Sequence, residues 1–402
     1  MRKRIIQGAL VAVLFMIALP VSSPANSNNW LYMSSLDYED SWTEMSPLIA
    51  PPGRVDSPLV YDSESDVVIV FGGHLGPGLP KHGDTWAYSF ENDEWTNMSP
   101  TVAPDVRGAH LLAYDSDSDR VILFGGLIRV DAEDGHVCFN DTWAYDYNSN
   151  TWTNMQPTTA PTARINPAMG YDQESDRVIL FGGILEGTTV AADTWAYDYN
   201  TNTWENMNPA SHPSTRFAAA MAYNSAEDKM ILTGGTPDGT SGYTDTWSYD
   251  YDTNTWTNLN PSEPPEDSAM FMTYDVEDDI CLFFGEGDEN AKTKVYDYPS
   301  NTWTSLIHSA HPPGRVRSPL AYDVNSDVTI LFGGMTGWYE NRPNDTWAYD
   351  YQPQQYTDTT NSGPSTTTPP PPPPPIIDPI WLAVGAGAAV LVVVVLVYVR
   401  KQ

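Results

Sequence analysis

One sequence pattern occurs six times between residues 54 and 356, with a period near 50 residues. Each copy opens with a segment that ends in Tyr, and a glycine always stands eleven residues after that Tyr. The six tyrosines are Tyr61, Tyr114, Tyr171, Tyr223, Tyr274 and Tyr322. Five copies then contain Asp-Thr-Trp, and another aromatic residue stands nine residues after its Trp. Such self-similarity indicates a repeat architecture in which each copy is one structural unit.

Each copy also has the pattern of a small antiparallel sheet. Four short apolar runs are separated by turn-rich stretches, as in residues 109–114, 121–124, 142–147 and 151–155. This alternation is typical of a four-stranded meander. One such sheet cannot bury both of its faces, but six sheets packed radially can. The sequence therefore predicts an all-β fold, a six-bladed β-propeller over residues 30–356.

The spacing of the glycines and aromatic residues resembles the kelch motif of secreted or membrane-anchored prokaryotic proteins. In that motif a Gly-Gly doublet is followed by a Tyr, and a Trp stands seven residues after the Tyr. The matching pairs are Tyr88 and Trp95, Tyr145 and Trp152, Tyr197 and Trp204, Tyr249 and Trp256, and Tyr296 and Trp303. The resemblance implies the propeller fold but leaves function open, because kelch propellers act as binding modules, enzymes and scaffolds.

The two ends of the repeat region predict how the ring closes. The last copy ends in Tyr356 and lacks the Trp-Thr-x-Met-x-Pro motif that follows the other copies. A complete version of this motif begins at Trp42, twelve residues before Arg54. We therefore predict that residues 41–46 supply the outer strand of the last blade.

Two apolar runs outside the repeats predict export and anchoring. Basic residues followed by an apolar stretch make residues 1–25 a signal peptide. Residues 380–399 carry no charge and are long enough for a transmembrane helix, and the basic tail 400–402 should remain cytoplasmic. Residues 357–379 are rich in Thr, Ser and Pro and predict an extended stalk. We expect a single-pass type I protein of the cell membrane, with the propeller extracellular.

The charge of the chain limits its partners. A formal net charge of −33 argues against binding to nucleic acid or to anionic lipid. We expect a monomer whose partner is an extracellular protein or glycan, and membrane contact only through the C-terminal helix. The seven histidines are scattered, so we expect neither a metal nor a cofactor. Glycosylation sequons begin at Asn97, Asn140 and Asn344.

The connections between strands define two faces of the predicted ring. Face A carries the start of each first strand, the 2–3 loops and the 4–1 loops, whereas face B carries the 1–2 and 3–4 turns. The 2–3 loop varies in length, as binding loops do. Its exposed aromatic residues Trp338 and Tyr339 are therefore candidate binding residues, and face A is the candidate binding face.

Face A also receives five arginines, which are further candidate binding residues. These are Arg54, Arg107, Arg164, Arg216 and Arg315. They could form an anion-binding ring, or they could pair with the Asp of each Asp-Thr-Trp motif. The fifth copy has Asp267 in place of Arg and Thr293 in place of Asp, and this joint loss favours ion pairs.

Face B collects acidic residues, with 17 Asp and Glu in the six 1–2 turns. The sequence Asp115-x-Asp117-x-Asp119 is similar to a calcium loop, but Arg120 stands where that loop requires Gly. We interpret these carboxylates as caps of the hairpins.

The sequence favours a non-catalytic binding or adhesion module, and it names no catalytic residue. The alternative is a surface carbohydrate-active enzyme similar to kelch mutarotases or oxidases. The oxidase resemblance implies paired His ligands and a Tyr–Cys crosslink, which the scattered histidines do not support. A pocket containing a carboxyl or His with a shifted pKa would favour an enzyme.

Overall fold

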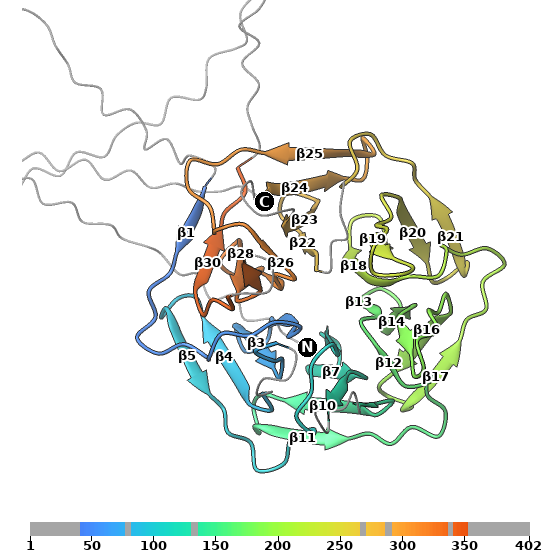
Figure 1. Cartoon of the computed structure of the whole chain (residues 1–402), viewed down its shortest axis with the longest axis horizontal. Helices are drawn as coiled ribbons and strands as arrows, with labels where there is room; N and C mark the ends of the chain where they lie inside the picture. The colour runs from blue at the N-terminus through green and yellow to red at the C-terminus, as the bar shows by residue number, and fades with distance from the viewer. Residues whose placement is uncertain are drawn as a thin grey trace, which may run out of the picture. The chain divides into compact units, whose positions relative to one another are not determined.

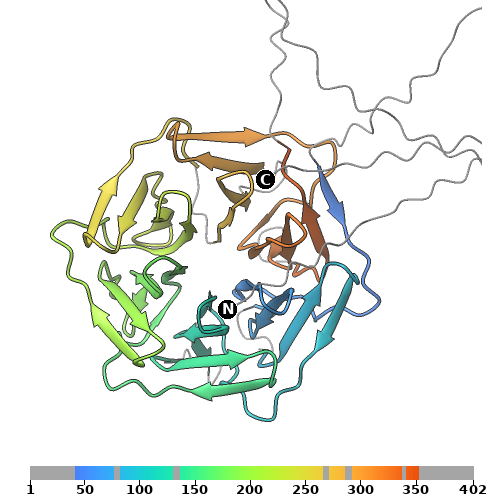
Figure 2. The same ribbon diagram turned by 180° about the vertical axis from the view of Figure 1, so that it is seen from behind.

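The computed structural model describes residues 41–76, 82–129, 136–265, 271–285, 292–336 and 341–352. Six four-stranded antiparallel sheets surround a central axis, as both faces of the ring show (Figures 1 and 2). The predicted all-β, six-bladed propeller is confirmed. In each blade the first strand lies next to the axis and the fourth strand lies at the periphery.

The first three blades follow the order of the chain. Blade one contains β2 (Leu59–Asp62), β3 (Val67–Phe71), β4 (Thr85–Ser89) and β5 (Glu94–Asn97). Blade two contains β6 (Leu111–Asp115), β7 (Arg120–Phe124), β10 (Thr142–Asp146) and β11 (Thr151–Asn154). Blade three contains β13 (Ala168–Asp172), β14 (Arg177–Phe181), β16 (Thr194–Asp198) and β17 (Thr203–Asn206).

The last blade takes one strand from the other end of the chain. Blade four contains β18 (Phe217–Asn224), β19 (Lys229–Thr236), β20 (Thr246–Asp250) and β21 (Thr255–Asn258). Blade five contains β22 (Thr273–Asp275), β23 (Ile280–Gly285), β24 (Lys292–Asp297) and β25 (Thr302–Leu306). Blade six contains β27 (Leu320–Asp323), β28 (Val328–Phe332), β30 (Thr346–Tyr349) and β1 (Trp42–Glu44).

The predicted closure of the ring is confirmed. Strand β1 runs antiparallel to β30, with Trp42 opposite Tyr349 and Glu44 opposite Trp347. The two strands lie side by side in Figure 1, although they come from opposite ends of the described chain. Blade six therefore combines one strand from the N-terminal end of the described chain with three strands from its C-terminal end.

Three two-stranded ladders extend face A beyond the blades. The connection before a first strand pairs with the start of the following 2–3 loop in blades three and six. These pairs are β12 (Arg164–Ile165) with β15 (Ile184–Leu185), and β26 (Arg315–Val316) with β29 (Met335–Thr336). The long 2–3 loop of blade two folds on itself as β8 (Leu127–Arg129) and β9 (His136–Cys138).

Aromatic wedges join neighbouring blades. Trp152 of blade two packs against Phe71 of blade one, and its indole Nε1 donates to Thr85 Oγ1 at 3.0 Å. The same bond between an outer Trp and a Thr of the preceding blade occurs at all six junctions. Trp42 makes it to Thr293 at 2.8 Å, so β1 reproduces the joint that every other fourth strand makes.

Several predicted features lie outside the described residues. They are the signal peptide 1–25, the stalk 357–379, the helix 380–399, the tail 400–402, Tyr356, Asp267, Trp338 and Tyr339. Within the part of the chain that the structure describes, no helix has the length and apolar character needed to cross a membrane.

Candidate functional site

The five face A arginines form internal ion pairs. Each guanidinium is at most 1% exposed and bonds both carboxylate oxygens of one Asp through two nitrogens. The pairs are Arg54–Asp84, Arg107–Asp141, Arg164–Asp193, Arg216–Asp245 and Arg315–Asp345. Each Arg also donates to the carbonyl of the first glycine of its doublet, and each Asp accepts from the indole two residues later, as Asp193 does from Trp195 at 2.7 Å.

These contacts determine what the arginines do. Burial opposes ionisation of Asp193, but the hydrogen bond and charge of Arg164 outweigh it and lower the pKa of the carboxyl. The Arg therefore fastens the start of a first strand to the start of the third strand of the same blade. We name this unit the latch, and its donors are already occupied inside the protein.

The strand register corrects our alignment of blade five. Thr293 lies opposite Phe284, as Thr85 lies opposite Phe71, so Thr293 occupies the Thr position of the motif and Lys292 occupies the Asp position. The prediction that Thr293 replaces Asp was wrong by one residue. The sequence alignment of blade five was shifted because its 2–3 loop is short and because Lys294 stands where the other blades have the Trp of Asp-Thr-Trp.

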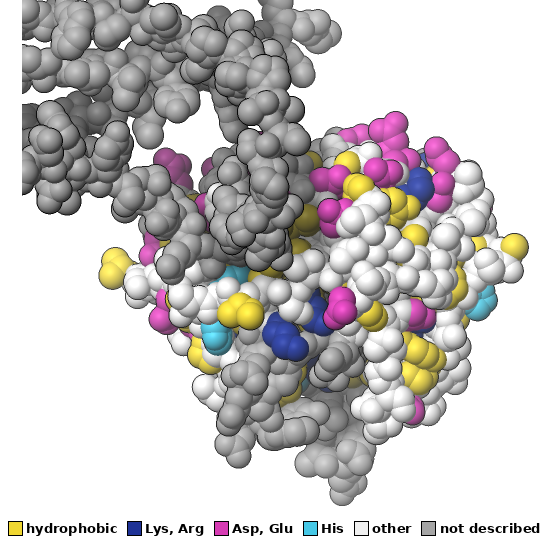
Figure 3. Space-filling model, turned by 90° about the horizontal axis from the view of Figure 1, so that it is seen from above, with side chains coloured by type: hydrophobic (Ala, Val, Ile, Leu, Met, Phe, Trp, Pro, Cys, Tyr) yellow, Lys and Arg dark blue, Asp and Glu magenta, His cyan; other side chains and the backbone are white. Residues whose placement is uncertain are grey.

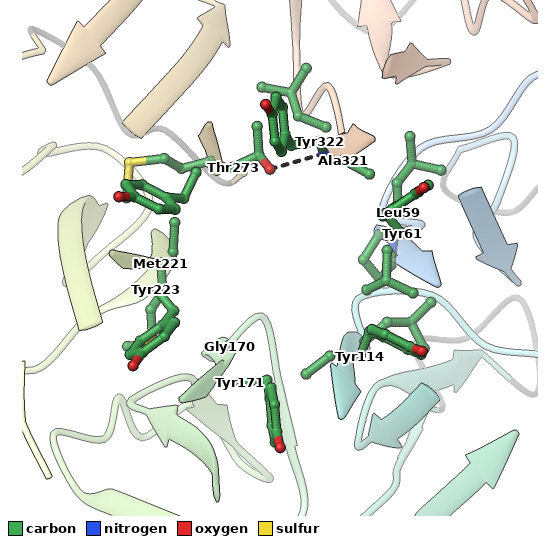
Figure 4. A pocket seen from close by; sticks show the side chains of 18 of the residues that line it. Leu59, Tyr61, Tyr114, Gly170, Tyr171, Met221, Tyr223, Thr273, Ala321 and Tyr322 are labelled. Atoms are coloured by element: carbon green, nitrogen blue, oxygen red, sulfur yellow. Dashed lines mark hydrogen bonds between the residues drawn. The ribbon is translucent and has the colours of Figure 1, made fainter. Parts of the chain in front are cut away.

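The central channel contains a cavity of about 480 Å³ that opens toward face B. Its wall consists mainly of aliphatic and aromatic side chains from the first strands of all six blades and the residues just before them (Figure 4). Residues of the 1–2 turns form its mouth. The apolar wall includes Leu59, Leu111, Met169, Met221, Phe271 and Leu320. The mouth includes Ser63, Ser116, Gln173, Ser225, Val276 and Val324. None of the five latch arginines lines this cavity.

The tyrosines that mark the repeats form a ring in this wall. Each hydroxyl donates to the Asp five residues later in its own 1–2 turn, at 2.7–3.1 Å. At five of the six tyrosines a second carboxylate, from the residue after the Tyr of the preceding blade, also approaches the hydroxyl, as Asp62 does at Tyr114. At Tyr274 that residue is Asn224, which carries no charge. Burial and these carboxylates raise the pKa of each phenol above its usual value. The hydroxyls therefore stay protonated and engaged in the turns, and the same six residues contribute to the cavity lining.

The carboxylates behind the tyrosines cap the hairpins, as predicted. Asp115 accepts a hydrogen bond from the backbone N–H of Ser118 at 2.9 Å, and Asp172 accepts one from Ser175 at 3.0 Å. Burial raises the pKa of Asp172 to about 6, although the Ser175 hydrogen bond lowers it, and the charge of Asp228 adds to the rise. Blade four has Asn224 at this position, which bonds Asp279 at 3.3 Å instead of repelling it.

One acidic group has the spacing of a small cation site. Asp275, Asp278 and Asp327 each bring a carboxylate oxygen within 4.8 Å of the others at the junction of blades five and six. Burial and the charges of Asp275 and Asp327 raise the pKa of Asp278 to about 6. These three side chains are the described residues that could hold a metal.

Comparisons with known proteins agree with this geometry. The family model named KLHDC2/KLHL20/DRC7 Kelch-repeats domain matches residues 21–212 and 173–373, which together span most of the chain. The protein belongs to the kelch-repeat family. Its propeller is therefore a kelch propeller, as the resemblance implied.

The individual relatives of this kelch propeller share its repeats rather than their full length. The flagellar outer arm dynein alpha chain of Chlamydomonas reinhardtii is 24% identical over 270 residues, which cover 60% of this chain and 6% of the dynein. The tRNA wybutosine-synthesizing protein 4 of Eremothecium gossypii is 28% identical over 194 residues, which cover 47% and 26% of the two chains. The solved structure of YjhT has a TM-score of 0.56 at 16% identity, covering 75% of this chain and 97% of YjhT, and so supports the fold alone.

One cluster breaks the repeat at the face A end of the channel. Asp56 is 4% exposed and contacts Arg317 Nη1 and His74 Nε2, each at 2.8 Å. Burial raises its pKa, but the charge of Arg317 and the contact with His74 outweigh this and hold the pKa at about 2. The equivalent position, two residues after the latch Arg, is Ala109 in blade two and Ala218 in blade four. In blade three this position is the uncharged Asn166. Among the described residues, Asp56 and Arg317 are therefore the charged residues at this position of the repeat.

The remaining predicted site residues are exposed or lie outside the residues that the structure describes. The sequon residues Asn97, Asn140 and Asn344 are exposed. Trp338 and Tyr339 lie outside the described residues, so the structure does not place them beside the latches. The Tyr ring was not predicted as a site, although the presence of Tyr in all six repeats was the available signal. Asp56 and Arg317 were not predicted either, although aligned repeats have uncharged residues at this position in blades two, three and four.

Proposed function

We propose that this kelch propeller is a non-catalytic binding module for a protein or glycan, held outside the cell by its predicted C-terminal anchor. The observation that carries the proposal is the cavity of about 480 Å³ in the channel, within the range of roughly 300–1,000 Å³ typical of ligand sites. Its wall offers mostly aliphatic and aromatic groups, while the phenols are already bonded to carboxylates. Such a wall supports binding better than proton transfer.

The proposal moves the binding site from face A to face B. The latch arginines are occupied in ion pairs, and the cavity opens among the 1–2 turns. A stalk of 23 residues (357–379) would span about 70 Å if extended, so a partner could reach a mouth that faces the membrane.

Glycan and peptide arrays probed with the purified full-length protein test this proposal. Ser63→Trp would plug the mouth, because Ser63 is exposed and lines the cavity. Ser149→Trp is the matched control, since Ser149 is exposed in a 3–4 turn on the same face and does not line the cavity. We expect a ligand that the wild type and Ser149→Trp retain and Ser63→Trp loses. Equal binding by all three proteins would contradict the channel as the site.

The second candidate function is a surface carbohydrate-active enzyme, and the Asp56–His74–Arg317 cluster favours it. A carboxylate that orients an imidazole is an arrangement that enzymes use for proton transfer. Array ligands incubated with the protein should return unchanged by NMR, including their anomeric ratio. Conversion that disappears in Asp56→Asn would overturn the binding module in favour of the enzyme.

A further inference from the structure

We propose that the channel takes a short basic and apolar peptide segment of a partner protein, inserted through the mouth on face B. This inference rests on the proposed binding function and specifies the partner's chemistry. Three features of the described residues carry it: the apolar wall, the bonded tyrosines and the acidic rim.

The wall selects against a ligand that needs many hydrogen bonds. The cavity walls present Leu, Met, Ala and Phe side chains together with parts of the six repeat tyrosines. The Tyr hydroxyls already donate to carboxylates at 2.7–3.1 Å. A glycan would leave hydroxyls unpaired against such a wall, at a cost in affinity. Leu-like or Val-like side chains would instead gain from leaving water.

The rim around the mouth is acidic and exposed. Three residues after the ring Tyr, four blades carry an exposed carboxylate: Glu64, Asp117, Glu174 and Glu277. The edge-on view shows acidic side chains gathered along one rim of the ring (Figure 3). The basic residues of these turns are occupied, since Arg120, Arg177 and Lys229 pair with Asp146, Asp198 and Asp250 at 3.0–3.2 Å. The rim is thus complementary to a basic segment.

Three peptides of one length test the inference against the wild-type protein. They are acetyl-Lys-Leu-Lys-Leu-Lys-amide and its analogues with Gln or Glu in place of Lys. We expect the Lys peptide to bind about tenfold more tightly than the Gln peptide, and the Glu peptide not to bind. Raising the salt concentration should weaken the binding of the Lys peptide and leave the binding of the Gln peptide nearly unchanged.

Two fourfold variants locate the effect. The rim variant combines Glu64→Gln, Asp117→Asn, Glu174→Gln and Glu277→Gln. The control variant removes four charges from exposed positions of the outer turns and strands on the same protein: Glu91→Gln, Glu94→Gln, Glu205→Gln and Asp252→Asn. We expect the rim variant to lose about tenfold in affinity for the Lys peptide and the control to lose less than about twofold.

The outcomes separate this inference from the proposed function. Equal binding of the Lys and Gln peptides, or equal losses in the two fourfold variants, overturns the basic partner. If no peptide binds while a glycan binds and Ser63→Trp abolishes it, the inference fails and the binding function stands. If Ser63→Trp weakens the binding of none of the array ligands or test peptides, the proposed function fails as well.

Discussion

At the scale of single residues, the same side chains recur because each fastens one part of a blade. The latch arginine joins the first and third strands, the outer Trp joins two blades, and the ring Tyr joins a turn to the channel wall. Sequence reasoning predicted the latch, because blade five lacks its Arg. Thr293 was assigned to the wrong position of the motif, because the Trp that follows this Thr in the other blades is replaced by Lys294 in blade five.

The latch should contribute stability that a surface ion pair does not. In Arg164→Ala, Asp193 keeps a half-buried carboxylate without its partner, and we expect a loss of about 3 kcal/mol in the free energy of unfolding. Arg177→Ala is the control, because Arg177 pairs with Asp198 at the surface and should cost no more than about 1 kcal/mol. Chemical denaturation measures both. Similar small losses in the two variants would count against a structural latch.

Asp172 should make stability depend on pH in a defined direction. Its pKa of about 6 in the folded protein exceeds the ordinary 3.8, so the folded state binds more protons between these values. The stability linked to this group is therefore present below pH ~4 and is lost as the pH rises through ~6. Asp172→Asn should stabilise the protein by about 1 kcal/mol at pH 7, allowing for solvent screening, and little at pH 4.

Asn224 offers the reverse experiment, because it holds the same turn through its side-chain oxygen and the N–H of Glu227 at 3.0 Å. Asn224→Asp should destabilise the protein at pH 7 and recover toward pH 4. Melting temperatures across this range measure both variants. A loss of stability in Asp172→Asn at every pH would show that its charge is favourable.

At the scale of elements, one rule explains closure: every fourth strand carries a Trp into the preceding blade. Strand β1 obeys this rule although it precedes blade one in the chain. The spacing from Trp42 to Arg54 was enough to predict this. The contact between Asp56 and Arg317 could not be predicted in the same way, because these residues stand 261 residues apart and meet only after the ring has closed.

Trp42→Ala should therefore cost as much as the loss of an internal wedge. Trp42 and Trp152 are each 2% exposed and each donate to a Thr of the preceding blade. We expect both Ala variants to lose about 3–5 kcal/mol in the free energy of unfolding. Ile307→Ala, at a position that is 97% exposed, should be near neutral. Closure by β1 would be refuted if Trp42→Ala behaved like Ile307→Ala.

At the scale of the whole molecule, the acidic turns and the C-terminal end of the last described strand lie on the same face of the ring. Acidic turns surround the channel mouth on face B, and β30, the last described strand, ends on that face. We therefore propose that the mouth faces the membrane. Length of stalk should then control access to the mouth. Removing residues 364–375 would shorten an extended stalk by roughly 40 Å.

On cells, we expect this shortened protein to bind the Lys peptide fused to a bulky fluorescent protein less well than the full-length protein does. The two proteins should bind it equally once purified. Flow cytometry and a titration in solution make the comparison. Unchanged binding on cells would argue against a mouth that faces the membrane.

The most direct test of the channel as the binding site is fluorine NMR of the full-length protein labelled with 3-fluorotyrosine. Tyr171 lies in the channel wall, whereas Tyr243 lies over the latch Arg216 on face A, with 4.3 Å between ring centroid and guanidinium. Tyr→Phe variants assign the two signals. On titration with a ligand selected by the arrays, the Tyr171 signal should shift and the Tyr243 signal should not. A shift of Tyr243 with Tyr171 unmoved would place binding on face A and contradict the channel site.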